Sequence, residues 1–280
     1  MKQPPYTVKS IIPSEIPVAE MHNYLRASVA PRPIALVSSV SADGEIALSS
    51  FSFFNVFSAN PPVLIFSPTR RVRDNSTKHT LENVKKTREC VINVVTEDIV
   101  QQASLSSTEF EKGINEFEKA GFHEVKSDLV APPRVLESKV SFECKVKEIL
   151  ELGTDAGAGS LVVCEVVKMH IHGEVLGDDG RICTERMKLV ARMGENWYSK
   201  AFGDALFEIS KPLHTLGAGF DKLPREIRES EILTGNDLAK LANIEAIPPG
   251  VYSRDVHDHA RAKQLLNNCR IHDAWQALIR

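Results

Sequence analysis

The densest set of residues that could hold a ligand lies in residues 49–58, which read Ser-Ser-Phe-Ser-Phe-Phe-Asn-Val-Phe-Ser. A half-buried strand usually alternates aliphatic with charged residues, whereas the polar positions here carry small hydroxyls and one amide. Short hydroxyl side chains and backbone N–H groups can surround a phosphate or a flat polar heterocycle, and phenylalanine rings can form an apolar wall. The segment therefore predicts one wall of a ligand site. The plainer alternative is a buried Ser/Phe-rich strand of an antiparallel barrel.

A run of basic residues follows in the loop of residues 67–80, at Arg70, Arg71, Arg73 and Lys78. This loop leads into a predicted helix, and cations together with the unpaired N–H groups at the start of a helix can bind a phosphate. A solvated, charged loop is the alternative interpretation. Because the loop comes soon after the Ser/Phe-rich segment, the two together favour a ligand site.

Arg32 lies between two prolines in the segment Ala30-Pro-Arg-Pro-Ile34, just before the first predicted strand. The prolines would stiffen this entry and could fix the direction of the arginine. On its own the motif indicates a structural strand entrance.

His170 and His172 alternate on one predicted strand, and by the same alternation Cys164 would share their face. These residue types can bind a metal, but the sequence places no carboxylate or further histidine near them, and zinc sites usually have tighter spacing. We therefore expect no metal site. His170 is expected either to line a ligand pocket or to be an ordinary histidine of the surface or core.

Three common motifs are absent from the sequence, namely G-x-S-x-G, G-x-G-x-x-G and the Walker A motif. Hydrolases with a nucleophile elbow, Rossmann folds and P-loop folds are therefore disfavoured. The residues that could do chemistry point to ligand binding and not to a side-chain nucleophile.

Short strands joined by tight turns are predicted to position these residues. Strands are expected at residues 34–41, 63–67, 90–95, 139–150 and 160–175, with further strand character in residues 45–59 and a hairpin turn at Asp43-Gly44. This spacing is typical of an antiparallel meander or barrel. Within residues 139–150 the alternation predicts a polar face that includes Ser141 and Glu143.

Helices are expected between and after these strands. Residues 74–77 can cap a helix whose apolar face carries Leu81 and Val84, and a short helix over residues 115–120 should end at Gly121. The strand pattern ends near residue 200, and helical stretches follow at residues 224–230, 236–243 and 259–280. We predict an N-terminal lead-in over residues 1–20, a barrel domain over 21–200 and a helical C-terminal extension over 201–280.

Composition limits the class of protein. The 34 basic and 37 acidic residues give a formal net charge of -3, which provides no electrostatic basis for binding nucleic acid or an anionic membrane. The five cysteines are odd in number and contain no C-x-x-C pair, which favours reduced thiols in a cytosol. The first residues, MKQPPYTVKS, lack the apolar segment of a secretory signal, so a cytoplasmic location is expected.

Several of these segments, taken in order, resemble the flavin reductase-like family with an FMN-binding split β-barrel, of the flavoredoxin type. The matching segments are Arg32-Pro-Ile-Ala-Leu-Val-Ser-Ser39, Asp43-Gly44, Ser50-Phe-Ser-Phe-Phe-Asn55, Asn60-Pro-Pro-Val63, Lys78 with Thr80-Leu-Glu-Asn83, Val91-Ile-Asn93, residues 115–121 and Pro133-Arg134. The resemblance covers about residues 20–200. It implies a mainly β fold, a Greek-key antiparallel split barrel, followed here by the helical extension.

The resemblance also implies a function. It predicts a homodimer with FMN at the subunit interface, and reduction of flavin with NADH or NADPH as electron donor. A redox partner protein or a flavin-dependent monooxygenase could receive the electrons. The alternative is a flavoredoxin-like electron carrier without a nicotinamide site of its own, and a further one is a non-redox protein on the same barrel.

Site residues are carried over by position. Ser38 and Ser39 would lie along the flavin with their backbone groups, residues 49–52 would line the ring and ribityl chain, and His170 would stand near the isoalloxazine or the nicotinamide. Lys78 and Thr80 would hold the phosphate, helped by Arg70 or Arg73. The candidate cofactor-binding residues are thus Arg32, Ser38, Ser39, Ser49, Ser50, Phe51, Ser52, Asn55, Arg73, Lys78 and Thr80, with His170 as the catalytic candidate. His79 departs from the acidic residue expected at its position in many relatives.

Overall fold

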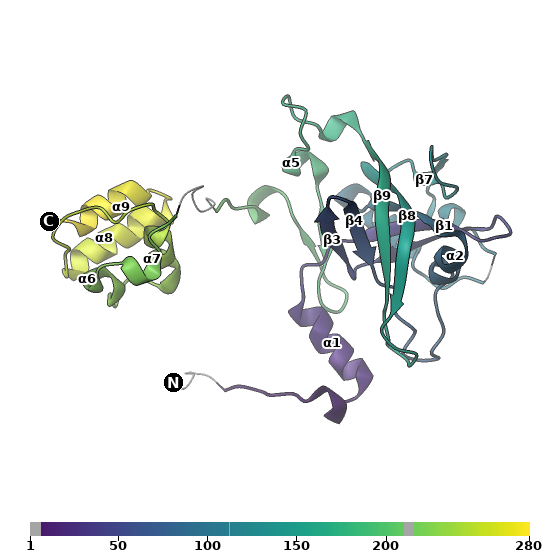
Figure 1. Ribbon diagram of the computed structural model, residues 1–280, viewed down its shortest axis with the longest axis horizontal. Coiled ribbons are helices and arrows are strands. Elements are labelled where there is room, and N and C mark those ends of the chain that lie inside the picture. Colours follow the sequence, from purple (N-terminus) through teal and green to yellow (C-terminus); the bar gives the residue numbers. More distant parts are fainter. Residues whose placement is uncertain (1–6, 112, 210–215) are drawn as a thin grey trace. The chain divides into compact units, whose positions relative to one another are not determined.

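The computed structural model describes residues 7–111, 113–209 and 216–280. It divides into two compact units, Met1–Leu206 and Phe207–Arg280 (Figure 1). The boundary lies a few residues after the end of the barrel domain expected from the sequence. Within the described ranges, no helix is long and apolar enough to cross a bilayer.

The first unit contains most of the regular structure. Its strands are β1 (Ala35–Val40), β2 (Ile46–Phe51), β3 (Phe54–Ala59), β4 (Pro62–Phe66), β5 (Glu89–Val94), β6 (Glu124–Val125), β7 (Arg134–Val135), β8 (Val140–Glu151), β9 (Ser160–Ile171), β10 (Val190–Arg192) and β11 (Tyr198–Lys200). Its helices are α1 (Val18–Ser28), α2 (His79–Thr87), α3 (Val100–Leu105), α4 (Glu116–Ala120) and α5 (Thr184–Met187).

Seven strands form one antiparallel sheet in the order β2-β1-β5-β8-β9-β4-β3. The two edge strands, β2 and β3, follow one another in the chain, and only Ser52 and Phe53 connect them. Three Cα steps span at most about 11 Å, so this connection brings the two edges of the sheet together. The sheet must therefore curl into a barrel, which confirms the predicted fold class.

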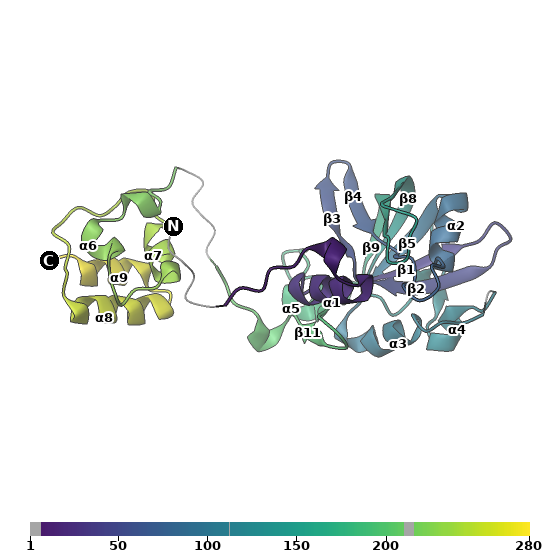
Figure 2. The same cartoon turned by 90° about the horizontal axis from the view of Figure 1, so that it is seen from below.

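Alternate residues of the barrel strands face two different cores. The interior contains Phe51 and Phe66, and Leu81 and Val84 of α2 pack into the same cluster. On the opposite face, Leu36 and Leu48 pack with Phe117 of α4. Figure 2 shows α3 and α4 on one side of the sheet and α2 on another. The short helix α4 begins and ends as predicted, with Asn115 as its cap and Gly121 in the left-handed conformation after it.

Strand β9 does not keep its alternation, because a β-bulge interrupts it. Cys144 pairs with Val166, whereas the neighbouring Glu143 pairs with Lys168, so β9 has one extra residue there. Cys164 faces the barrel interior, where its Sγ lies 3.7 Å from Sγ of Cys90. Because of the extra residue, His170 lies on the opposite face of β9 although an even number of residues separates it from Cys164. The prediction that Cys164 shares a face with His170 was wrong for this reason.

Two further expectations differ from the structure. Helix α1 begins at Val18, inside the segment that we predicted as an extended lead-in, whose residues 1–6 lie outside the described ranges. The polar face predicted for β8 lies opposite the barrel interior as expected, but it is not exposed at Ser141 and Glu143, which are 3 % and 0 % exposed. That face is covered by a loop that comes from a distant part of the sequence, as described below.

The second unit is helical, as predicted, and has a core of its own. It contains α6 (Arg225–Arg228), α7 (Gly235–Ala242), α8 (Val256–Asn267) and α9 (Ile271–Leu278). Leu241, Leu266, Trp275 and Leu278 are buried together between these helices. A capping box between Thr234 and Asp237 starts α7.

Candidate functional site

Lys78 is the N-cap residue of α2, directly after the basic loop. Its side chain is half-buried, and its Nζ donates a hydrogen bond to Oγ of Ser49 at 2.8 Å and lies 5.3 Å from the ring centre of Phe51. Burial, followed by the positive charge of Arg71, lowers the pKa of Lys78 to about 8. In the part of the chain that the structure describes, no carboxylate forms an ion pair with this ammonium. A half-buried cation whose partner is a neutral hydroxyl is suited to an anionic ligand.

Three neighbouring hollows meet at Lys78. The first, here the hydroxyl hollow, is lined by Ser49, Thr80, Ser106, Ser107 and Thr108 together with Arg71, His79, Glu109, Phe110 and Glu116. The second, the arginine hollow, has a volume of about 360 Å³ and is lined by Arg70, Arg71 and Arg73 together with His22, Thr69, Val72, Glu109 and Gly157. The third, the phenylalanine hollow, has a volume of about 210 Å³ and is lined by residues 50–53 together with His22, Arg26, Ser67, Thr69 and Arg192.

Strand β2 supplies side chains to these hollows from both of its faces. Ser49 and Phe51 point to the barrel side and meet Lys78, whereas the hydroxyl of Ser50 lies 2.5 Å from that of Ser107. Because β2 is an edge strand, its outer N–H groups need partners from elsewhere. The N–H of Leu48 donates to the Glu116 carboxylate, and that of Ser50 donates to the Ser107 hydroxyl.

The arginines of the basic loop are partly neutralised by acidic neighbours. Arg71 and Arg73 both form ion pairs with Glu109, the first with an Nε–Oε1 distance of 2.5 Å, and Arg73 also pairs with Asp74. Hydrogen bonds to Asn75 hold the Arg70 guanidinium. The arginine hollow therefore has a cationic rim whose charges are already engaged by side chains of the same chain.

The structure brings most of the predicted cofactor-binding residues together. Those that line the three hollows are Ser49, Ser50, Phe51, Ser52, Arg73, Lys78 and Thr80. They come from β2, from the connection between β2 and β3, and from the loop and first turn of α2. Their convergence follows from the pairing of β1 with β2 and from the packing of α2 on the same two strands.

Three predicted residues lie elsewhere, and a fourth lies beside the phenylalanine hollow. The hydroxyl of Ser38 donates to the carbonyl of Pro133, and that of Ser39 accepts from the Asn83 amide, with both serines fully buried. Asn55 is exposed on β3, where its side chain accepts a hydrogen bond from the N–H of Val56.

The guanidinium of Arg32 donates to the carbonyls of Arg26, Val29 and Met193, so it holds the end of α1. Its Nε also lies 3.5 Å from the Ser52 hydroxyl, and its Cζ lies 5.9 Å from the ring centre of Phe53, so it borders the phenylalanine hollow.

Other residues at the hollows were not among the predicted ones. His22 and Arg26 come from the unpredicted helix α1, and Arg192 comes from β10, so only the folded chain could reveal them. Residues 106–109, in contrast, form the run Ser-Ser-Thr-Glu, which has the same small-hydroxyl character as residues 49–52. That composition marks residues 106–109 as candidates for the same site from the sequence alone.

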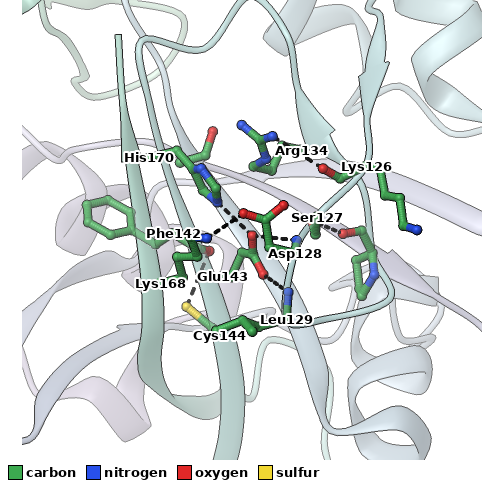
Figure 3. Close-up of polar contacts among 12 residues, drawn as sticks. Lys126, Ser127, Asp128, Leu129, Arg134, Phe142, Glu143, Cys144, Lys168 and His170 are labelled. Carbon is green, nitrogen blue, oxygen red and sulfur yellow. Dashed lines mark hydrogen bonds and ion pairs between the residues drawn. The ribbon is translucent and has the colours of Figure 1, made fainter. Parts of the chain in front are cut away.

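His170 belongs to a separate polar cluster, shown in Figure 3. Its Nε2 lies 2.6 Å from Oε1 of Glu143, a fully buried carboxylate that also accepts the N–H groups of Asp128 and Leu129. Lys168 forms an ion pair with Asp128 at 2.5 Å. A carboxylate therefore does lie beside His170, contrary to the expectation from the sequence. It sits there because Glu143 is two residues from Ser141, the register partner of His170, and therefore lies on the same face of β8.

This cluster is separate from the hollows at Lys78 within one chain. Strands β8, β5 and β1 lie between β9 and β2 in one direction around the barrel, and β4 and β3 lie between them in the other. His170 also does not line any of the three hollows. Asp128, Glu143 and His170 place ligand-type atoms within 4.8 Å of one another. Backbone N–H groups and Lys168 already engage both carboxylates, so we assign this cluster to fastening residues 126–132 onto β8.

Comparison with known proteins finds similarity over the barrel unit. Residues 27–186 match a family model described as the flavin reductase like domain. The chain is 36 % identical over 181 residues to an uncharacterized protein of Aquifex aeolicus (strain VF5), and the match covers 65 % of this chain and 90 % of that protein.

Solved structures show the same architecture. Nitrilotriacetate monooxygenase component B from Bacillus cereus superposes with a TM-score of 0.67 at 28 % identity, over 73 % of this chain and 100 % of that chain. A protein with a split barrel domain from Shewanella frigidimarina NCIMB 400 gives a TM-score of 0.60 at 24 % identity, over 71 % and 95 % of the two chains. The second likeness identifies the curled seven-stranded sheet as a split barrel.

Proposed function

The chain belongs to the flavin reductase-like domain family, and from this membership we propose that it is an FMN-binding flavoprotein that oxidises NADH or NADPH. The observation that carries the proposal is the half-buried ammonium of Lys78, which donates to the Ser49 hydroxyl and, among the described residues, forms no ion pair, although Glu109 and Glu116 line the same hollow. Such a cation fits a phosphorylated flavin better than an uncharged one.

Each part of FMN has suitable residues in the three hollows. Lys78, Thr80 and Ser49 of the hydroxyl hollow would hold the phosphate with one ammonium and two hydroxyls. Residues 50–53 of the phenylalanine hollow would place aromatic rings and small hydroxyls against the ring system and ribityl chain. When bound, FMN supplies the hydride and electron transfer, while the chain binds and orients it.

A homodimer forms part of the proposal, with the flavin at the interface. The phenylalanine hollow is open, and the nearby edge strand β3 exposes Val56 and Phe57, which are 65 % and 62 % exposed. A second subunit would cover such an apolar strand and close the hollow over the ring. His170 would reach a flavin only across such an interface, since it lies outside the hollows of its own chain.

The test is anaerobic mixing of the FMN-loaded protein with NADH or with NADPH, followed by the visible flavin absorbance. We expect at least one of the two nucleotides to bleach the flavin, after which air should restore its colour. Loaded protein that stays yellow with both nucleotides, but is reduced by dithionite, would favour the electron-carrier alternative. Protein that binds no flavin would overturn the proposal altogether.

A further inference from the structure

Glu109 occupies the position between the two hollows that a phosphate would be expected to approach. It lines both the hydroxyl hollow and the arginine hollow, and Lys78 and Arg71 line both as well. Its two carboxylate oxygens pair with Arg71 and Arg73. A carboxylate that accepts from two guanidinium groups makes the same kind of contacts that a phosphate would make there.

Water reaches the Glu109 end of both ion pairs. The Glu109 side chain is 44 % exposed, and those of Arg73 and Arg71 are 65 % and 25 % exposed, so water screens the Arg73 pair more than the Arg71 pair. A dianionic phosphate beside Lys78 would also repel this carboxylate across the shared hollow. The free energy needed to displace Glu109 from the arginines would therefore be small. It would nevertheless lower the affinity for every ligand that carries a phosphate.

We propose that Glu109 is an internal counter-anion of the cofactor site, whose carboxylate holds Arg71 and Arg73 until the phosphate of a flavin nucleotide replaces it. This inference rests on the proposed function, since it concerns the same phosphate. Glu109 thereby sets the affinity for phosphorylated flavins and leaves the affinity for riboflavin, which has no phosphate, unchanged.

The test compares FMN with riboflavin, by titration of apo-protein and flavin fluorescence, in the wild type and in Glu109→Gln. Losing the carboxylate should tighten FMN binding by about fivefold, the factor that an exposed ion pair can contribute, without changing riboflavin binding. Glu111→Gln is the matched control, because it removes the same charge from the same loop, and it should change neither affinity. Glu109→Ala should change the two affinities as Glu109→Gln does. Agreement between the two variants would show that the effect comes from losing the carboxylate and not from the new amide.

The outcomes separate this inference from the proposed function. Weaker FMN binding in both Glu109 variants would mean that Glu109 positions the arginines for the ligand, which overturns the inference. An equal change for FMN and riboflavin, or no change for either, would overturn it as well. Wild-type protein that binds neither flavin would instead overturn the proposed function.

Discussion

Lys78 combines partial burial with a neutral hydrogen-bond partner, which favours the binding of an anion. Its position at the N-cap of α2 places it beside the unpaired N–H groups of the first turn, and its burial against Ser49 and Phe51 makes its charge costly in the free protein. The lowered pKa, about 8, expresses that cost. A bound phosphate would compensate it.

The affinity for FMN should therefore depend on pH above neutrality. Below pH 8 the free protein carries a charged Lys78, whereas above it the lysine becomes neutral and binding must take up a proton. The FMN phosphate stays dianionic above about pH 6. Titrations at pH 7, 8 and 9 should show FMN affinity falling by about fivefold over the last step and about tenfold over the whole range, with riboflavin affinity constant. A flat FMN profile, or a parallel fall for riboflavin, would remove Lys78 from the phosphate site.

Glu143 yields a prediction about stability. Burial by itself would raise the pKa of Glu143, but the N–H of Asp128, the imidazole of His170 and the N–H of Leu129 together lower it. A carboxyl group with a lowered pKa stabilises the fold above its unfolded pKa of about 4.3, and this stabilisation is lost as the pH falls further. Glu143→Gln should lower the free energy of unfolding by about 1–3 kcal/mol at pH 7, and by less at pH 4.

Urea denaturation at the two pH values measures this difference. The control is Glu148→Gln on the same strand, where the side chain is exposed and should tolerate the change. A Glu143→Gln loss of equal size at pH 7 and pH 4 would contradict the assigned role of the carboxylate charge.

The sequence alone identified those candidate site residues that stand out by their own type and their near neighbours in the chain. Lys78, Thr80 and residues 49–52 are recognisable because their types differ from those of an ordinary strand or helix start. The alternation of β8 placed Glu143 on its polar face, but it could not show that residues 126–132 cover that face. Nor could the sequence show the carboxylate beside His170, since only the strand register reveals that neighbour.

At the scale of elements, hydrophobic periodicity located α2 and the long strands, and the cap at Asn115 located α4. The caps expected for α2 at residues 74–77 were wrong, because its N-cap is Lys78 and no side chain caps it. Periodicity could not reveal that residues 45–59 form two strands at opposite edges of the sheet, because both parts have the same composition. Nor could it reveal the bulge in β9, since one extra residue leaves the amino-acid pattern unchanged. Long-range pairing decides both features.

The edge strand β3 provides the prediction at this scale. Its exposed Phe57 should be covered by the partner subunit, and burying a phenylalanine contributes about 1.5–3 kcal/mol. Phe57→Ser should therefore weaken the dimer by about tenfold or more in sedimentation equilibrium, and FMN binding should weaken with it. Phe220→Ser, which changes a half-exposed phenylalanine of the C-terminal unit, is the control. A Phe57→Ser variant that dimerises like the wild type would exclude β3 from the interface.

At the scale of the whole molecule, the two units differ in what they share with relatives. The matched family model ends at residue 186, before the C-terminal unit begins at Phe207. The core of that unit is made of its own helices, and the core clusters of the barrel contain only residues between Ile34 and Phe202. From the end of the strand pattern near residue 200, the sequence analysis placed the start of a C-terminal extension at residue 201.

Removal of the C-terminal unit should therefore leave the flavin site intact. A chain that ends at Leu206 should fold and bind FMN with an affinity within about twofold of the full chain, since the described residues of the three hollows all precede that point. Circular dichroism and FMN titration would check both parts. A folded but flavin-free truncated protein would show that the C-terminal unit contributes to the site.

Comparing FMN with riboflavin tests most directly the proposal that Lys78 holds the phosphate of FMN. Equilibrium titrations should show wild-type protein preferring FMN by about tenfold or more, because a charge-assisted contact contributes about 1.5–3 kcal/mol. Lys78→Ala should abolish that preference by weakening FMN alone, whereas Lys86→Ala, on the exposed side of the same helix, should preserve it. Equal affinity of the wild type for the two flavins, or an equal loss of both in Lys78→Ala, would contradict the account.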